Sequence, residues 1–310
     1  MSGTLVVVNR GAGGGRGGAT WDRISAGLPA LAGARVISRP GVEAALAELG
    51  AALDAGGASG VDRVVAVGGD GTLSRVADLL LSRSGGGAVE VPLGIVPAGT
   101  GSDLAKALGL PQDPRGALER SLARPGDPAA ARTVDALEIA AAGGARRFAV
   151  NVVSAGVSGE VDEAVAALPR RGQATYLAAT LRALARYRSA RCRIAVDGEP
   201  WYEGDLLLLA VANGPTFGRG MRIAPHAEVD DGEADVVLVP RLPGWQVPIQ
   251  LPKLYRGTHL ASRYVRWRRG RTVDLEPLDE RMPPLDVDGD PWPASAVRIT
   301  VRPGALRVLA

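Results

Sequence analysis

The sequence predicts an α/β domain followed by an antiparallel β domain within a chain of 310 residues. Three observations indicate this fold class. Short β-branched runs alternate with helical patterns over the first 110 or so residues. A Pro/Gly-rich stretch at 123–132 then interrupts the pattern. Beyond it, strand candidates and an Asp-Gly turn dominate. The length itself suits about two domains.

The first domain is expected to hold a mostly parallel sheet with helices on its faces, because strands alternate with helices. In such a sheet, functional loops lie at the carboxyl ends of the strands, and glycines gather there at 11–18, 68–71 and 99–101. The strand candidates are Leu5–Val8, Ala34–Ile37, Val61–Val67 and Pro92–Val96, and the helix candidates are Trp21–Leu31, Val42–Leu53 and Leu73–Leu81.

The second domain is expected to be antiparallel. Arg191–Val196 and Trp201–Ala212 flank Asp197 and Gly198, a dipeptide typical of a hairpin turn. The further strand candidates are Arg132–Ala140, Arg146–Val153, Ala234–Val239, Thr272–Leu275 and Val297–Val301, with helices at Glu160–Leu168 and Thr175–Arg188.

Composition excludes several classes of protein. Lys and Arg total 36 against 33 Asp and Glu, and this net charge of +3 argues against nucleic-acid binding. One cysteine excludes an intrachain disulfide, and two histidines exclude a His-rich metal centre. No apolar run approaches the roughly 18 residues of a membrane span, and the N-terminal apolar run is too short for a signal peptide. We therefore expect a cytoplasmic protein.

The first glycine loop is a weak nucleotide signal. Gly13, Gly15 and Gly18 match the dinucleotide pattern GxGxxG after a strand. A nicotinamide site also needs an acidic residue about 20 positions later, where this chain has Arg39. No GK[ST] follows the glycines, so a Walker loop is excluded.

The second and third loops are stronger candidates for a phosphate site. Gly68–Thr72 (GGDGT) follows an apolar strand and enters a helix, and 99–103 (GTGSD) repeats that logic after the next strand. Glycines let backbone N–H groups approach a phosphate, and a carboxylate such as Asp70 suits a divalent cation beside it. The alternative is two tight turns whose Asp residues cap helices, with Lys106 solvated. Two such loops on neighbouring strands favour function.

These motifs resemble the catalytic domain of the diacylglycerol kinase family. GGDGT is shared with NAD kinases and 6-phosphofructokinases, and the GTGSD loop selects the branch of bacterial lipid kinases and sphingosine kinases. The resemblance continues through 151–156, 212–214, 223–235 and 288–290, so it covers nearly the whole chain.

The resemblance implies a Rossmann-like ATP-binding domain at 1–131, joined by 304–310, and a β-sandwich lipid-substrate domain at 132–303. It places the active site in the cleft between them and implies ATP and Mg²⁺ as cofactors. It assigns the binding of the nucleotide phosphates to Asn9 and to the two loops. The loop residues concerned are Gly68, Gly69, Gly71, Thr72, Gly99, Thr100, Ser102 and Asp103. Asp70 would engage Mg²⁺.

Acidic residues in the second half are assigned by the same resemblance. Asp288, followed by Gly289 and Asp290, would be the general base, whereas the similar Asp197 is interpreted as a hairpin turn. Asp290 stands where the family usually has Glu, and it would contact metal or substrate. Asp231 resembles the structural Mg²⁺ ligand of some bacterial members, with a charged surface turn as the alternative.

Some positions depart from the family pattern. Arg10 replaces Pro, Ser74 and Arg75 replace Asn and Glu, and Ser102 replaces Asn. The departures concern nucleotide contacts, and the glycines and Asp residues of the motifs are present.

The function implied is transfer of the γ-phosphoryl group of ATP to a lipid hydroxyl such as that of diacylglycerol, in phospholipid metabolism. The alternatives are an NAD-kinase-like soluble kinase and a catalytically weak lipid-binding regulator. The segment Arg263–Arg271 holds five arginines and two aromatic residues, and it predicts peripheral contact with an anionic membrane, unless it is an exposed strand with solvated arginines. The acceptor and the oligomeric state, a homodimer included, stay open.

Overall fold

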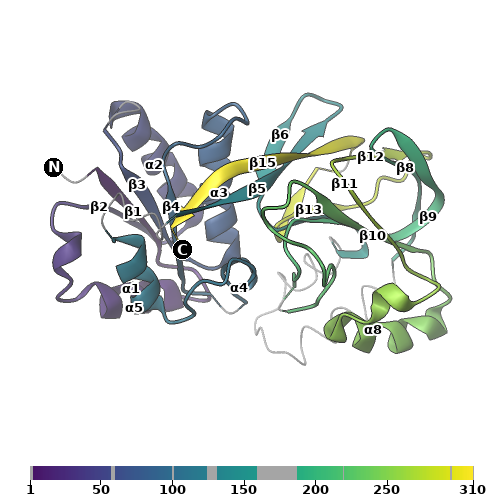
Figure 1. Cartoon of the computed structure of the whole chain (residues 1–310), viewed down its shortest axis with the longest axis horizontal. Helices are drawn as coiled ribbons and strands as arrows, with labels where there is room; N and C mark the ends of the chain where they lie inside the picture. Colours follow the sequence, from purple (N-terminus) through teal and green to yellow (C-terminus); the bar gives the residue numbers. More distant parts are fainter. Residues whose placement is uncertain are drawn as a thin grey trace. The chain divides into compact units, whose positions relative to one another are not determined.

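The computed structural model of the chain describes residues 3–56, 60–99, 101–123, 131–158, 187–218, 220–293 and 295–309. They belong to two compact units. Unit 1 comprises Met1–Ala136 and Arg302–Ala310, and unit 2 comprises Leu137–Val301. Figure 1 labels the elements of both. The predicted helices Glu160–Leu168 and Thr175–Arg188 fall mainly outside the described residues, as does most of 123–132.

Unit 1 is built on a parallel sheet, as predicted. Its strand order is β2-β1-β3-β4-β15, and each neighbouring pair is parallel. The strands are β1 (Thr4–Asn9), β2 (Arg35–Arg39), β3 (Arg63–Gly68), β4 (Leu93–Pro97) and the end of β15 (Val297–Leu309). Every residue of β3 and β4 is buried, which suits a sheet covered on both faces.

Helices follow the strands of unit 1. They are α1 (Arg16–Ser25), α2 (Val42–Gly56), α3 (Asp70–Arg83), α4 (Asp103–Ala107) and α5 (Pro114–Ser121). Trp21 of α1 and Leu118 of α5 pack with Val65 of the sheet in one apolar cluster. The buried Arg63 guanidinium donates to the Ser121 carbonyl at 3.0 Å, which places a cation at the carbonyl end of α5.

The predicted helix Trp21–Leu31 is wrong in its bounds. Helix α1 begins at Arg16, because Gly15 at φ 93° supplies the left-handed residue before its first turn. It ends at Ser25, and Gly27 at φ 66° turns the chain into a 3₁₀ turn that starts at Pro29. Proline lacks the N–H that would continue the α-helical hydrogen bonds.

Unit 2 is antiparallel. The predicted hairpin is confirmed as β8 (Ala190–Val196) and β9 (Glu199–Ala212), with Asp197 at φ 54° and Gly198 at φ 81° in the turn. The first part of β9 pairs with β8, and its last part pairs with both β7 and β10. The other strands are the end of β5 (Ala131–Ala141), β6 (Arg146–Ala149), β7 (Val152–Gly156), β10 (Ala234–Pro240), β11 (Arg266–Gly270), β12 (Thr272–Pro277), β13 (Leu285–Val287), β14 (Asp290–Trp292) and the start of β15.

The predicted strand Arg146–Val153 is two strands, β6 and β7. The chain leaves the ladder at Val150 and Asn151, whose N–H groups donate to the Asp288 carboxylate. The Asp288 side chain, from the β13–β14 turn, thus accepts N–H hydrogen bonds that a continuous strand would donate to a neighbouring strand. The local sequence pattern could not predict this break between β6 and β7.

Helix α8 (Val247–Arg256), with the 3₁₀ turns η3 (Gly244–Gln246) and η4 (His259–Ala261), was not predicted. Its Leu254, with Leu260, packs against a cluster that includes Ile223 and Val237. Pro252 lies inside the helix, which weakened the helical signal in the sequence. Within the part of the chain that is described, no helix combines the length and the apolar character needed to cross a membrane.

His259 links stability to pH. Its ring is buried and Nε2 lies 2.9 Å from the Ile223 carbonyl oxygen. Burial lowers the pKa of His259 below its ordinary 6.5. The fold therefore favours the neutral ring, and this stabilisation is complete above about pH 6.5 and is lost as pH falls.

We expect the free energy of unfolding to drop by up to about 1.4 kcal/mol per pH unit below pH 6.5, and His259→Gln to remove that dependence. Urea unfolding between pH 5 and 7.5 measures it, and equal slopes in both proteins would contradict it.

Candidate functional site

Three loops of unit 1 lie together at the carboxyl ends of β1, β3 and β4. The Asn9 side chain, at the end of β1, donates from Nδ2 to Thr72 Oγ1 at 2.9 Å and accepts from the Gly11 N–H at 3.2 Å. In the first loop, Gly13 lies so close to the chain after β4 that a Cβ on it would be 3.5 Å from the Ala98 carbonyl oxygen. The topology of the sheet thus gathers the predicted phosphate loops.

Close backbone packing explains the glycines of the second and third loops. A Cβ on Gly99 would lie 2.6 Å from the Gly69 Cα, so the two loops pack backbone against backbone. A Cβ on Gly68 would lie 2.6 Å from the Thr72 Cβ, at the first turn of α3. The Gly69 carbonyl accepts from the Thr72 N–H at 2.9 Å, while Gly71 lies within that turn. Side chains at these glycines would separate the loops.

Two carboxylates lie beside Gly101. The Asp70 Oδ1 accepts from the Leu104 N–H at 3.2 Å, so the start of α3 is tied to the start of α4. A Cβ on Gly101 would meet Asp70 Oδ2 at 2.9 Å and Asp103 Oδ2 at 3.6 Å. Asp70 is half-buried and Asp103 is buried. The two acidic residues that the sequence assigned to neighbouring turns therefore lie beside the same glycine.

The start of α4 is conformationally special. Ser102, the residue before the helix, has φ 54°, which non-glycine residues adopt rarely. The Lys106 Nζ donates to the Gly101 carbonyl at 2.6 Å, so the lysine belongs to this loop. The predicted Thr100 lies outside the described residues.

This arrangement suits a nucleotide phosphate with a hard cation. Glycine loops before the helices α3 and α4 allow a phosphate to approach the backbone. Mg²⁺ is usually held by one or two carboxylates together with substrate phosphates, and Asp70 and Asp103 fit that donor set. No group of three or more acidic, His or Cys ligands exists among the described residues.

Two of the residues that depart from the family pattern have surface partners. The Arg10 guanidinium donates to both carboxylate oxygens of Asp22, at 3.0 and 2.7 Å, and Arg75 pairs with Glu43 at 2.9 Å. Both arginine side chains are thus paired with carboxylates of unit 1.

The loop packing predicts the effect of Gly99→Ala. The new Cβ would meet backbone atoms of Gly69, which can move only by shifting the loop, so we expect a loss of about 1–3 kcal/mol of stability together with weaker nucleotide binding. Gly41→Ala is the matched control, since nothing lies within 4 Å of its Cβ, and it should stay within about 0.5 kcal/mol of wild type. Urea unfolding and nucleotide titration measure both. Equal stability of the two variants would contradict the packing argument.

Asp288 lies in unit 2 and is held by three backbone amides. Its Oδ1 accepts from the N–H groups of Asn151 (3.0 Å) and Val152 (2.8 Å), and its Oδ2 from that of Val150 (2.9 Å). The residue has φ 53° in the turn between β13 and β14. The carboxylate thus has a defined orientation, and it also ties this turn to the β6–β7 connection.

The neighbours of Asp288 are also paired. Asp290 Oδ2 accepts from the Arg147 guanidinium at 2.8 Å, and Arg147 is buried. Asp286, also buried, accepts from the Gly289 N–H at 2.9 Å. The predicted Asp290 therefore has a cationic partner within unit 2. Arg147 was not among the residues singled out from the sequence, since it is one of two adjacent arginines in a strand that carries no recognised motif.

Asp231, the predicted metal ligand, lies beside a guanidinium. Its Oδ1 accepts from the Glu233 N–H at 3.0 Å, and its Oδ2 lies 3.4 Å from Arg269 Nη1. Arg269 also lies 3.6 Å from Asp235. Burial raises the pKa of Asp235, whereas the Trp267 Nε1–H bond at 2.6 Å and the Arg269 charge oppose the rise. A guanidinium thus supplies the positive charge here, and a metal would have to compete with it.

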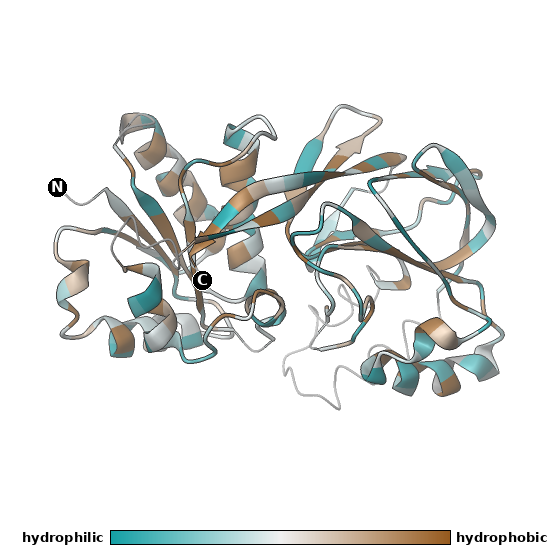
Figure 2. Ribbon diagram, in the orientation of Figure 1, coloured by the Kyte–Doolittle hydropathy of each residue, from teal (hydrophilic) through white to brown (hydrophobic). Residues whose placement is uncertain are grey.

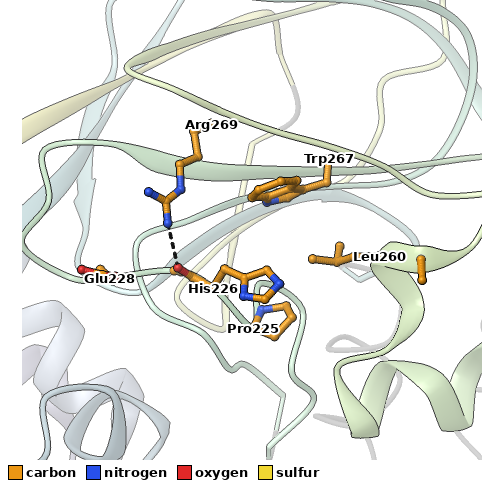
Figure 3. Close-up of a pocket in the computed structure, with 8 residues that line it drawn as sticks. Pro225, His226, Glu228, Leu260, Trp267 and Arg269 are labelled. Atoms are coloured by element: carbon orange, nitrogen blue, oxygen red, sulfur yellow. Dashed lines mark hydrogen bonds between the residues drawn. The ribbon is translucent and has the colours of Figure 1, made fainter.

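Arg269 and Trp267 also line an open pocket of about 810 Å³ in unit 2 (Figure 3). Arg269 donates to the His226 carbonyl at 3.1 Å, and the His226 and Trp267 rings meet edge to face at 5.9 Å between centroids. The pocket is further lined by Pro225, Ala227, Glu228, Leu260 and Ala261. Because two carboxylates neutralise the Arg269 guanidinium, this side chain does not make the pocket positively charged.

The comparisons with known proteins assign the family. Residues 3–134 match the diacylglycerol kinase catalytic domain, and residues 151–310 match the YegS C-terminal NAD kinase beta sandwich-like domain. A "probable lipid kinase YegS-like" protein of Stenotrophomonas maltophilia is 34% identical over 251 residues, covering 80% of this chain and 79% of its own. One from Xanthomonas euvesicatoria pv. vesicatoria is 36% identical over 255 residues, covering 81% and 79%. The chain belongs to this YegS-like family with a diacylglycerol kinase catalytic domain.

Solved structures show the same fold. A putative diacylglycerol kinase from Bacillus anthracis matches with a TM-score of 0.73 at 22% identity, covering 99% of this chain and 96% of its own. The predicted fold class, an α/β domain with a C-terminal β-sandwich domain, is confirmed. This protein is therefore a kinase of the diacylglycerol kinase type. Its YegS-like relatives are named probable lipid kinases.

Proposed function

We propose that the protein transfers the γ-phosphoryl group of ATP to the hydroxyl of a lipid alcohol, with diacylglycerol as the representative acceptor and Mg²⁺ as the metal. The observation that carries the proposal is the pair of glycine loops packed backbone to backbone, with the Asp70 and Asp103 carboxylates beside Gly101. A lipid acceptor is supported by the names of the YegS-like relatives.

The residues of unit 1 would hold the nucleotide. The loops that carry Gly68, Gly69 and Gly99 would offer backbone N–H groups to a phosphate. Asn9 and Thr72 form a polar pair at the same strand ends. Asp70 and Asp103 would hold Mg²⁺, which would neutralise charge on the phosphates. Phosphoryl transfer depends mainly on such positioning and charge neutralisation, so the protein need not supply a covalent intermediate.

Asp288 would accept the proton of the attacking hydroxyl. The hydroxyl oxygen forms a bond to the γ-phosphorus while the bond to the β,γ-bridging oxygen breaks, and ADP leaves with that oxygen. A carboxylate is a weak base for an alcohol, so the proton would move late, as the new bond forms. The three amide donors from Val150, Asn151 and Val152 fix how the carboxylate is aimed.

Asp231 and Asp290 have lesser parts in this proposal. Asp290 would act with Arg147, its partner at 2.8 Å, in holding the turn that carries Asp288. Asp231 as a structural Mg²⁺ ligand stays a prediction, and the nearby Arg269 guanidinium argues against a tightly held cation.

The test is a radiolabelled-ATP assay with Mg²⁺ and a panel of lipid alcohols in neutral detergent micelles. The panel contains diacylglycerol, sphingosine and a polyprenol, and NAD is included as a soluble acceptor. We expect labelled product that partitions into organic solvent for one lipid class. Label on NAD alone, or no transfer to any acceptor while the protein stays folded, would overturn the proposal.

A further inference from the structure

Helix α8 and the turn before it expose an apolar row. Trp245 is 65% exposed and Ile249 is 48% exposed, the two highest values among the exposed large apolar side chains of the described residues. Pro252 is also exposed. Ile249 and Pro252, three residues apart, lie on one face of α8, and Arg256 follows Pro252 by four residues. Trp245 lies in the 3₁₀ turn η3 just before the helix. In Figure 2 the ribbon of α8 alternates between hydrophobic and hydrophilic segments (compare Figure 1).

The opposite side of α8 is what attaches it to unit 2. Leu254 packs on the cluster around Ile223 and Val237, and the Leu254 carbonyl accepts from the Arg222 N–H at 3.2 Å. Gly257 ends the helix at φ 72°. Among the described side chains of α8, Leu254 therefore packs on unit 2, whereas Ile249 and Pro252 are exposed. Packing against the described residues of the unit accounts for the first and not for the other two.

The segment of sequence that carries the row has charges of a single sign. Residues 241–273 include eight Lys and Arg and no Asp or Glu. Lys253 and Arg256 lie on α8 itself, and neither forms an ion pair with any residue that the structure describes. Arg241, by contrast, forms an ion pair with Asp205 at 3.7 Å. An exposed Trp and Ile beside unneutralised cations is the pattern of a helix that lies in the headgroup region of an anionic membrane.

We propose that the surface formed by Trp245, Ile249, Pro252, Lys253 and Arg256, here called the α8 surface, binds an anionic lipid bilayer. The choice of a bilayer rests in part on the proposed function, since a lipid kinase must reach its acceptor. Charge complementarity supplies the independent argument: cations near an anionic surface contribute roughly 1 kcal/mol each, and the apolar row supplies area to bury.

This surface differs from the arginine segment Arg263–Arg271 that the sequence pointed to. There, Trp267 donates to Asp235 and Arg269 faces Asp231 and Asp235. Arg266 stacks on the Tyr202 ring at 5.3 Å. Much of that segment is engaged within unit 2, whereas Arg256 is exposed, Lys253 is half-buried, and neither forms an ion pair with a described residue.

The test is sedimentation of the full chain with vesicles of phosphatidylcholine, alone or with 30% phosphatidylglycerol, in low and high salt. Wild type should bind the anionic vesicles and release in high salt. The double variant Lys253→Glu/Arg256→Glu should need at least about tenfold more lipid for half-binding, and Trp245→Gln/Ile249→Gln about tenfold more. Trp245 fluorescence should shift to the blue on the anionic vesicles.

The control variant is Arg281→Glu/Met282→Gln, which makes the same kinds of change at another exposed apolar and basic pair of unit 2. It should bind as wild type does. If both α8 variants also bind as wild type does, the proposal is wrong. If they change only the oligomeric state, measured by light scattering, the surface is a contact between copies and the proposal is also wrong.

Failure here is separable from failure of the kinase proposal. Vesicle binding needs no turnover, and the α8 variants should keep wild-type activity on lipid acceptors in neutral detergent micelles while losing activity on anionic vesicles. A protein that binds vesicles through α8 and phosphorylates nothing would contradict only the proposed function. Full micelle activity with unchanged vesicle binding in the variants would contradict only the α8 proposal.

Discussion

Asp288→Asn should lower kcat by about 10²–10⁴-fold while the affinity for ATP changes little. The amide cannot accept the hydroxyl proton, and the nucleotide contacts belong to other residues. The same change should cost stability, because one of the three amides that now donate to the carboxylate, from Val150, Asn151 and Val152, would face an NH₂ group. That cost is about 1–3 kcal/mol. Steady-state kinetics with ATP titration, and urea unfolding of the same samples, measure the two effects separately.

Asp197→Asn is the matched control, because Asp197 occupies an equivalent Asp-Gly turn in the same unit. It has φ 54°, and its Oδ1 accepts from the N–H groups of Arg271 and Thr272, both at 2.8 Å. Asparagine keeps that oxygen, so the fold and kcat should both remain near wild type. If Asp288→Asn turns over at nearly the wild-type rate, or if both variants lose kcat equally, Asp288 is not the base.

Asp70→Asn should lower kcat/KM for ATP by about 10²–10³-fold and raise the Mg²⁺ concentration needed for half-maximal rate. The loss arises because a neutral amide is a weaker ligand for Mg²⁺ than a carboxylate, next to a phosphate chain that needs its charge neutralised. Asparagine can still accept the Leu104 N–H bond at its Oδ1, so the tie between α3 and α4 should survive. Kinetics at several Mg²⁺ concentrations give both quantities.

Asp113→Asn controls for the loss of an acidic residue at a helix start in unit 1. Asp113 precedes α5 and accepts from the Gly116 N–H at 2.7 Å, a role that asparagine also fills. This variant should keep its Mg²⁺ dependence. An unchanged Mg²⁺ dependence in Asp70→Asn would remove Asp70 from the metal site, even if kcat/KM fell.

Much of the candidate site could be predicted from local sequence. The runs before Gly68 and before Ala98 are long enough and apolar enough to be buried strands, and parallel strands bring their following loops to one edge. The juxtaposition of Asp70 and Asp103 therefore followed from pattern and topology, and the structure places both carboxylates beside Gly101. Similar reasoning predicted the Asp197-Gly198 hairpin, which depends only on residues adjacent in sequence.

Contacts between distant segments could not be predicted in this way. The Asp288 carboxylate binds amides more than 130 positions earlier and thereby splits one predicted strand into β6 and β7. The pairing of Arg147 with Asp290 and of Arg269 with Asp231 likewise joins residues whose local patterns give no sign of each other. Helix α8 escaped prediction because Pro252 interrupts it, and packing on Leu254 stabilises a segment whose own helical propensity is low.

By itself, the sequence determined the order of strands and helices in unit 1, the glycine loops at their ends and the family, because periodicity, turn chemistry and motif spacing act over short distances. Only the tertiary structure decided which charges are neutralised and which side chains stay exposed. It placed a guanidinium beside Asp231 and left Trp245 of η3 and Ile249 and Arg256 of α8 exposed. The physical reason is that the energies of ion pairing and of burial depend on neighbours in space, and a linear pattern of residues does not contain those neighbours.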